Sequence, residues 1–150
     1  MCEALLKQAL PSLPSCRITV TSAGLSAAPG RAAHPWATAA AQGFGISLEN
    51  HRARLLTPDM VNQADAIFAM DYGNLAQLLS RYPDARSKIF MLSAYASEDY
   101  PAVEITDPYY SGAEETRNCY TILYKCIGNL VHSLSHESHE PHRVPGRGAV

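Results

Sequence analysis

Residues 64–83, "ADAIFAMDYGNLAQLLSRYP", place a short apolar run directly before a helical pattern. Five apolar residues with an aspartate on each side are typical of a buried strand. Leu75, Leu78 and Leu79 then recur at the spacing of one helix face. A strand followed at once by a helix predicts an α/β unit, with its strand near residues 65–70.

The same alternation of strand-like and helical patterns extends over the rest of the chain. Strands are also predicted near 17–22, where β-branched residues alternate, and near 88–92. Parallel strands need helical connections, so the pattern predicts a short parallel sheet flanked by helices. The other predicted helices lie at 1–10, 34–45, 57–64 and 113–134.

Composition limits the class of protein. The 150 residues suit one domain, 47% of them are hydrophobic, and the net charge is −2. This charge gives no indication of nucleic acid or an anionic membrane as a partner. No apolar run approaches the roughly 20 residues of a membrane span, so no membrane insertion is expected. The four cysteines form no CxxC pair, which favours a cytoplasmic protein with reduced thiols.

A long irregular segment separates the last predicted strand from the last helix. It reads "ASEDYPAVEITDPYYSG" over residues 96–112, and long loops of compact domains are often functional. We expect one domain over residues 1–132 and a flexible, polar tail, rich in Pro and Gly, over residues 133–150.

Five short stretches occur in a characteristic order along residues 1–132. They are "TSAG" (21–24), "GISLENHRARLL" (45–56), "AIFAMDYGNL" (66–75), "SKIFML" (87–92) and "ITDPYYSG" (105–112). In this order the chain resembles the low-molecular-weight protein tyrosine phosphatases. The "NHRAR" form is similar to the bacterial branch, whose members often act on tyrosine kinases of capsule and exopolysaccharide export.

The resemblance implies a fold, an activity and partners. The fold is a three-layer α/β sandwich with a short parallel sheet of strand order 2-1-3-4. The activity is hydrolysis of phosphotyrosine through a Cys-phosphate intermediate, with no metal and no cofactor. The implied partners are phosphotyrosine proteins, among them a bacterial tyrosine kinase.

The chain begins inside a predicted helix, and no capping residue precedes it. In the family a strand and a phosphate-binding loop of pattern C-x5-R-S come before this helix, and we expect both to be absent here. The residues six positions after the four cysteines are Gln8, Ser22, Lys125 and His132, none of which is arginine. The chain alone is therefore expected to be inactive.

Several interpretations remain open. The chain can derive from an ordinary phosphatase whose start codon was assigned too late, or it can be a non-catalytic remnant. It can also be a module that binds phosphotyrosine or a kinase without catalysis. An arsenate reductase of the same fold is less favoured, because Cys119 and Cys126 lie deep in the final helix, where core packing is the simpler explanation.

Asp107 is the candidate general acid. It precedes Pro108, which keeps it extended and outside a helix. Protonation of the leaving tyrosine oxygen speeds a departure that is slow for a group of pKa ~10. By resemblance Asp107 is the proton donor, whereas an Asp-Pro turn is the plain structural alternative.

Four further residues are candidates through the resemblance. Tyr109 and Tyr110 are expected to wall a cleft for a flat phenyl ring, or else to pack beside the last helix. Ser22 and His51 are expected to support the phosphate-binding loop by hydrogen bonds, or else to be ordinary loop residues. The histidines of the last helix and tail suggest adventitious metal binding and no designed site.

Overall fold

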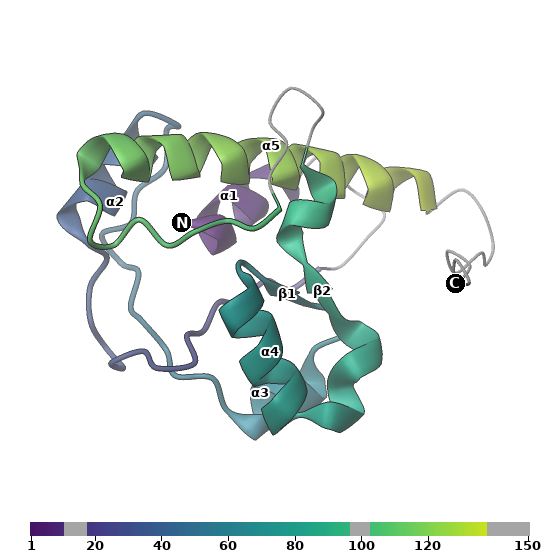
Figure 1. Cartoon of the computed structure of the whole chain (residues 1–150). Coiled ribbons are helices and arrows are strands. Elements are labelled where there is room, and N and C mark those ends of the chain that lie inside the picture. The colour runs from purple at the N-terminus through teal and green to yellow at the C-terminus, as the bar shows by residue number, and fades with distance from the viewer. Residues whose placement is uncertain (11–17, 97–102, 138–150) are drawn as a thin grey trace.

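The computed structural model describes residues 1–10, 18–96 and 103–137. Figure 1 shows a short parallel sheet between two layers of helices, as predicted. Along the chain the elements are α1 (Cys2–Ala9), α2 (Pro35–Gln42), α3 (Pro58–Gln63), β1 (Ile67–Ala69), α4 (Tyr72–Arg81), η2 (Pro83–Lys88), β2 (Ile89–Met91), η3 (Leu92–Tyr95) and α5 (Ala113–Glu137), where η marks a 3-10 helix.

The sheet pairs β1 with β2 in parallel, so that Ile67 lies beside Ile89. Side chains alternate between the two faces of a strand. Ala69 and Ile89 accordingly pack into the core under α3 and α4, whereas Phe68 packs against the core under α5. The alternation explains how the two faces of one short sheet pack against two different layers of helices.

The larger core lies where α1 and α2 pack against α5 (Figure 1). Its central side chains are Tyr120 and Cys126, both completely buried. The ring of Phe44 stacks on Tyr120 with the ring centroids 4.9 Å apart. Burial of apolar area at ~25 cal/mol per Å² in this core stabilises the fold.

Capping residues set the helix starts. The Thr57 hydroxyl accepts a hydrogen bond from the backbone N–H of Met60 at 3.3 Å, and Pro58 is the first residue of α3. The Asp71 carboxylate accepts from the N–H of Asn74 at 2.6 Å and starts α4 directly after β1. The cap formed by Asp71 thus starts α4 at the carboxyl end of β1.

Two predictions differ from the structure. The strand predicted near 17–22 is not formed by residues 18–22, because no described strand lies beside them to pair with; only Gly24 makes an isolated parallel bridge, to Leu55. The predicted tail of residues 133–150 is helical in its first part, because α5 continues to Glu137. Its remaining part, 138–150, lies outside the described residues, as do 97–102 of the long loop. No helix among the described residues is long and apolar enough to cross a membrane.

Candidate active site

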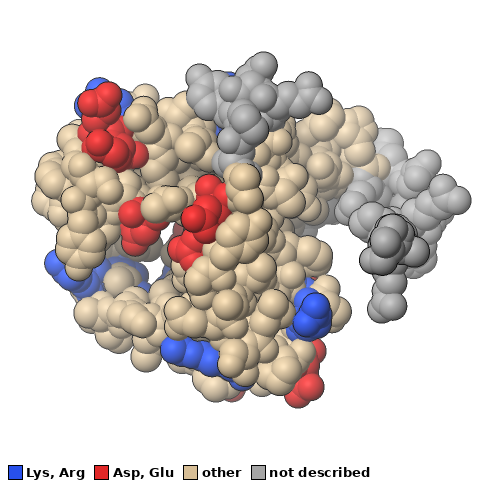
Figure 2. Space-filling model, viewed as in Figure 1, with Lys and Arg blue, Asp and Glu red and all other residues tan. Residues whose placement is uncertain are grey.

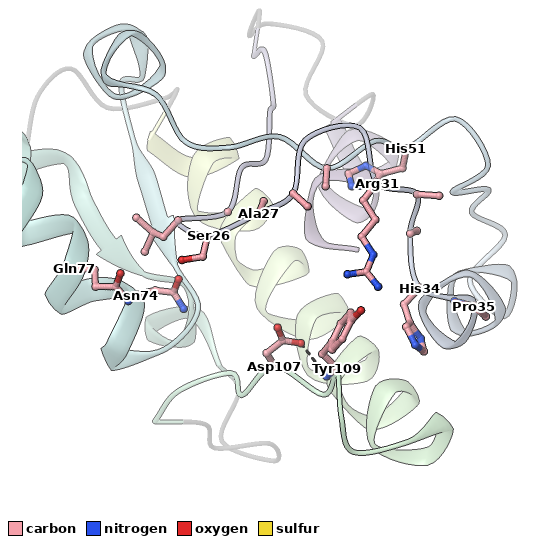
Figure 3. Close-up of a pocket in the computed structure, with 16 residues that line it drawn as sticks. Ser26, Ala27, Arg31, His34, Pro35, His51, Asn74, Gln77, Asp107 and Tyr109 are labelled. Atoms are coloured by element: carbon pink, nitrogen blue, oxygen red, sulfur yellow. Dashed lines mark hydrogen bonds between the residues drawn. The ribbon is translucent and has the colours of Figure 1, made fainter.

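A cavity of about 750 Å³ opens beside the carboxyl end of β1 (Figure 3). Segments that are distant in sequence line it, namely the loop 24–35, the segment 51–53, the first turns of α4, and Asp107 with Tyr109. In α/β folds ligands bind outside the carboxyl ends of the strands. The position of this cavity therefore makes it the candidate site.

Asp107 reaches the cavity from the segment that leads into α5. The backbone N–H of Ile105 donates to the carbonyl of Met70 at 2.7 Å, which ties this segment to the end of β1. The Asp107 carboxylate accepts from the N–H of Tyr109 at 3.0 Å, and Pro108 between them is buried. The predicted acid thus lines the cavity with an exposed carboxylate.

The Tyr109 ring forms an aromatic wall of the cavity. It lies against the rings of His34 and Tyr110, with centroids 5.2 and 4.8 Å away. The guanidinium carbon of Arg31 lies 5.5 Å from its centroid. Tyr110 itself is 93% exposed and does not line the cavity. Of the two predicted tyrosines, the structure brings only Tyr109 into the cavity.

A ladder of backbone hydrogen bonds shapes the opposite side of the cavity. The segment 51–56 lies along the loop 24–32, where the N–H of Gly24 donates to Arg54 at 2.9 Å and the N–H of Ala53 donates to Arg31 at 2.8 Å. Gly30 turns the loop with a φ of 81°, a conformation that glycine adopts without strain. This ladder fixes His51 and Arg31 beside the cavity.

His51, predicted from the sequence to support a phosphate-binding loop, lines the cavity. Burial, together with the nearby terminal amino group, lowers the pKa of its imidazole below the ordinary value. This shift favours the neutral imidazole, which can both donate and accept a hydrogen bond. It also borders an adjoining hollow of about 460 Å³ that is lined by Lys7 and Arg54.

Ser22 lies outside the cavity and bonds to Glu3. Its N–H donates to the Glu3 carboxylate at 3.0 Å, and its hydroxyl donates to the same oxygen. Lys7 and Arg54 pair with this carboxylate at 2.6 and 3.1 Å. Burial alone would raise the pKa of Glu3, but the hydrogen bonds from Lys7 and Ser22 and the nearby charges lower it to about 2.

No thiol lines the cavity among the described residues, since Cys119 and Cys126 are buried in α5 and Cys2 packs against the same core. Burial raises the pKa of Cys2 and of Cys119 to about 11, which suppresses the reactive thiolate. Cys16 lies outside the described residues. Within the described part of the chain, no group of three or more His, Cys, Asp or Glu side chains could hold a metal ion.

Sequence reasoning missed several residues of the site. Arg31 comes from a loop without a periodic pattern, and His34 was predicted only as the first residue of the helix at 34–45, so nothing in the sequence placed them beside Tyr109. Asn74 and Gln77 line the cavity from the polar face of α4. Their spacing of three on a predicted helix was the one available signal.

Comparisons with known proteins identify the family of this chain. A family model described as low molecular weight phosphotyrosine protein phosphatase matches residues 1–140. The low molecular weight protein-tyrosine-phosphatase Wzb of Salmonella typhi is 34% identical over 139 residues, which are 93% of this chain and 87% of the relative. The probable phosphatase EpsP of Ralstonia solanacearum is 36% identical over 109 residues, 73% of this chain and 68% of the relative.

Solved structures give the same result. The tyrosine phosphatase Wzb from Escherichia coli K30, in complex with sulphate, superposes with a TM-score of 0.77 at 28% identity, covering 89% of this chain and 87% of that one. The YwlE arginine phosphatase from Geobacillus stearothermophilus superposes with a TM-score of 0.80 at 28% identity, covering 95% and 89%. This chain therefore belongs to the low molecular weight phosphotyrosine protein phosphatase family.

Proposed function

We propose that the cavity receives the phosphorylated tyrosine of a protein substrate, with Asp107 as the general acid. The observation that carries the proposal is that the Asp107 carboxylate and the Tyr109 ring line one cavity from a single short segment. An aromatic wall suits a phenyl ring, and the adjacent carboxyl group suits protonation of the phenolic oxygen.

The proposed reaction needs a thiolate that these 150 residues do not present in the required pattern. In the first step the thiolate attacks phosphorus, the bond from phosphorus to the tyrosine oxygen breaks, and Asp107 gives that oxygen its proton. In the second step water attacks the phosphorus of the Cys-phosphate and gives a proton to Asp107. The bond from phosphorus to sulfur breaks, so that inorganic phosphate and the thiolate are released. Because no cysteine is followed six residues later by arginine, we propose that the 150 residues alone do not turn over.

Ser22 and His51 are proposed to hold the phosphate-binding loop of the family in shape. Ser22 would act through Glu3, to which it is bonded, and His51 through its neutral imidazole. Both residues lie next to the chain segment at α1, which the family resemblance makes the continuation of that loop. Their role is structural support, and neither is proposed to touch the substrate.

The proposed substrate is a phosphotyrosine protein of the cytoplasm, and a bacterial tyrosine kinase of polysaccharide export is the favoured example. Support comes from the similarity to Wzb and EpsP. A second candidate is binding of phosphotyrosine without catalysis. It is favoured by the guanidinium of Arg31 and the ring of Tyr109, which line the cavity although none of the described thiols does.

Two measurements test these proposals. First, the 150-residue chain is incubated with a phosphotyrosine peptide, a phosphoarginine peptide and p-nitrophenyl phosphate, and phosphate release is followed. We expect no release above buffer; turnover would contradict the proposed inactivity. Equilibrium binding of the same peptides then tests the second candidate. A module that binds phosphotyrosine should bind the phosphotyrosine peptide, whereas a remnant without function binds none of them.

Second, the protein is purified from its native host and its intact mass is determined. A mass above 16.3 kDa together with phosphatase activity would support the enzyme, and Asp107→Asn in that protein is expected to reduce kcat by about 10²–10⁴-fold. Activity that is unchanged by Asp107→Asn would reject Asp107 as the acid. Asp65→Asn, at an exposed aspartate before β1, is the matched control.

A further inference from the structure

Arg31 has an unusual position among the arginines of the described chain. Its backbone carbonyl is fixed by the N–H of Ala53 at 2.8 Å, and its side chain points into the cavity toward Tyr109 and Asp107 (Figure 3). The guanidinium carbon lies 5.5 Å from the centre of the Tyr109 ring. This ring contact positions the guanidinium without using its planar N–H donors.

Other arginines are bound to the protein itself. Arg54 pairs with Glu3, Arg52 donates to the carbonyls of Glu49 and His51, and Arg81 donates to Gln77 and to the carbonyl of Leu25. By contrast, no carboxylate among the described residues pairs with Arg31. Arg31 therefore lines the cavity with a guanidinium that forms no ion pair with the described carboxylates.

The carboxylates near the cavity are already hydrogen-bonded to backbone. Asp71 accepts from Asn74, Glu104 accepts from the N–H of Tyr72, and Asp107 accepts from that of Tyr109. Figure 2 shows acidic side chains near the middle of this face, with basic side chains toward its left and lower borders. The lining of the cavity itself holds the Arg31 guanidinium and the Asp107 carboxylate.

We propose that Arg31 selects substrate segments that carry an Asp or Glu next to the phosphorylated tyrosine, by pairing with that side chain. The inference rests on the proposed function, since it assumes that the phosphotyrosine ring lies beside Tyr109. The guanidinium carbon lies 5.5 Å from the centre of the Tyr109 ring. A phosphotyrosine beside Tyr109 would therefore bring its flanking residue near Arg31, because consecutive Cα atoms are only about 3.8 Å apart. The planar fork binds a carboxylate through two N–H donors, which gives direction as well as charge.

The test uses four peptides that differ in two positions, with Glu or Gln beside the tyrosine and with the tyrosine phosphorylated or not. Binding to the 150-residue chain is measured by NMR titration at low salt, with the Arg31 Nε–H and Tyr109 ring signals as reporters. We expect the Glu-flanked phosphopeptide to bind about three- to fivefold more tightly than the Gln-flanked one. High salt is expected to reduce this preference, since exposed charges are screened.

Three variants make the test specific. Arg31→Gln is expected to abolish the preference for Glu, Arg31→Lys to keep part of it, and Arg86→Gln, at an exposed arginine of η2 that does not line the cavity, to leave it intact. Equal weakening of both phosphopeptides by Arg31→Gln would overturn the proposal, because Arg31 would then bind the phosphate. A preference that survives Arg31→Gln, or no binding of any peptide at millimolar concentration, would also overturn it.

The peptide design distinguishes this inference from the proposed function. If phosphorylation strengthens binding but the flanking Glu does not, the inference fails and phosphotyrosine binding stands. If the flanking Glu strengthens binding through Arg31 whether or not the tyrosine is phosphorylated, the inference stands for acidic peptides and the phosphotyrosine site is rejected.

Discussion

The Glu3 carboxylate accepts hydrogen bonds from both the backbone N–H and the hydroxyl of Ser22, 19 residues further along the chain. Arg54 pairs with the same carboxylate from a third segment at 3.1 Å. One largely buried side chain in α1 thus joins the segment before the cavity loop to the segment that carries His51. The arrangement explains why an acidic residue occupies an otherwise apolar helix face.

Replacing Glu3 with Gln is expected to lower the free energy of unfolding by about 1–3 kcal/mol. The amide cannot satisfy Lys7, Arg54 and Ser22 together, and it leaves charges without a counter-ion. Urea denaturation followed by circular dichroism measures the change. Glu49→Gln, at an exposed glutamate of a neighbouring loop, should stay within 0.5 kcal/mol of the parent. A parent-like Glu3→Gln would show that the carboxylate is not bonded in solution.

The stability of the protein is expected to fall in acid because of Glu3. Its folded pKa of about 2 lies below the ordinary value of 4.5, so the ionised form favours the folded state. This contribution is fully present above pH ~4.5 and is lost as the pH falls toward 2. The difference in Tm between the parent and Glu3→Gln should therefore shrink between pH 5 and pH 2. A constant difference over this window would exclude Glu3 as its source.

Local chemistry predicted the helices better than the sheet. Thr57 and Pro58 lie at the start of α3, and Pro35 and Gly43 lie at the start and the end of α2; such signals are readable in the sequence because caps and proline act within one turn. The prediction of a strand near 17–22 was wrong. A strand also needs a neighbouring strand for hydrogen bonding, and its own sequence does not determine whether one lies beside it. Ser22 instead forms a hydrogen bond with Glu3. The two residues are distant in the sequence, and no local pattern predicts this contact.

The thiols of Cys2 and Cys119 are expected to resist alkylation in the folded protein. With a pKa raised by burial to about 11, only about one thiol in a thousand is ionised at pH 8. Iodoacetamide should therefore label both at least 100-fold more slowly in buffer than in 8 M urea, as followed by peptide mass spectrometry. Fast labelling of Cys119 in buffer would show that its thiolate is accessible, which would make Cys119 a candidate nucleophile.

The residues of the candidate site that could be predicted are those that belong to the family motifs and that the fold brings to the cavity. Asp107, Tyr109 and His51 line the cavity, whereas Tyr110, the neighbour of Tyr109, is exposed outside it. Motif order gives residue types and not side-chain directions. Arg31 was missed because its position depends on the backbone ladder to Ala53, which forms only in the folded chain.

Tyr120 has a ring that stabilises the core and a hydroxyl that does not. The side chain is fully buried and stacks on Phe44, and its hydroxyl has no hydrogen-bond partner among the described residues. Burial raises the pKa of this hydroxyl to about 12, so it stays protonated. A buried polar group without a partner costs about 1–3 kcal/mol, because it gave up its bond to water on folding.

Tyr120→Phe is therefore expected to leave the free energy of unfolding unchanged or to raise it by about 1 kcal/mol, since the ring contact remains and the unpaired hydroxyl is removed. Tyr124→Phe is the matched control, because Tyr124 also contacts Phe44 but is 55% exposed, and it should be neutral. Urea denaturation of the three proteins makes the comparison. If Tyr120→Phe loses more than 1 kcal/mol, the hydroxyl is hydrogen-bonded in solution, and the core around α5 is less dry than its packing indicates.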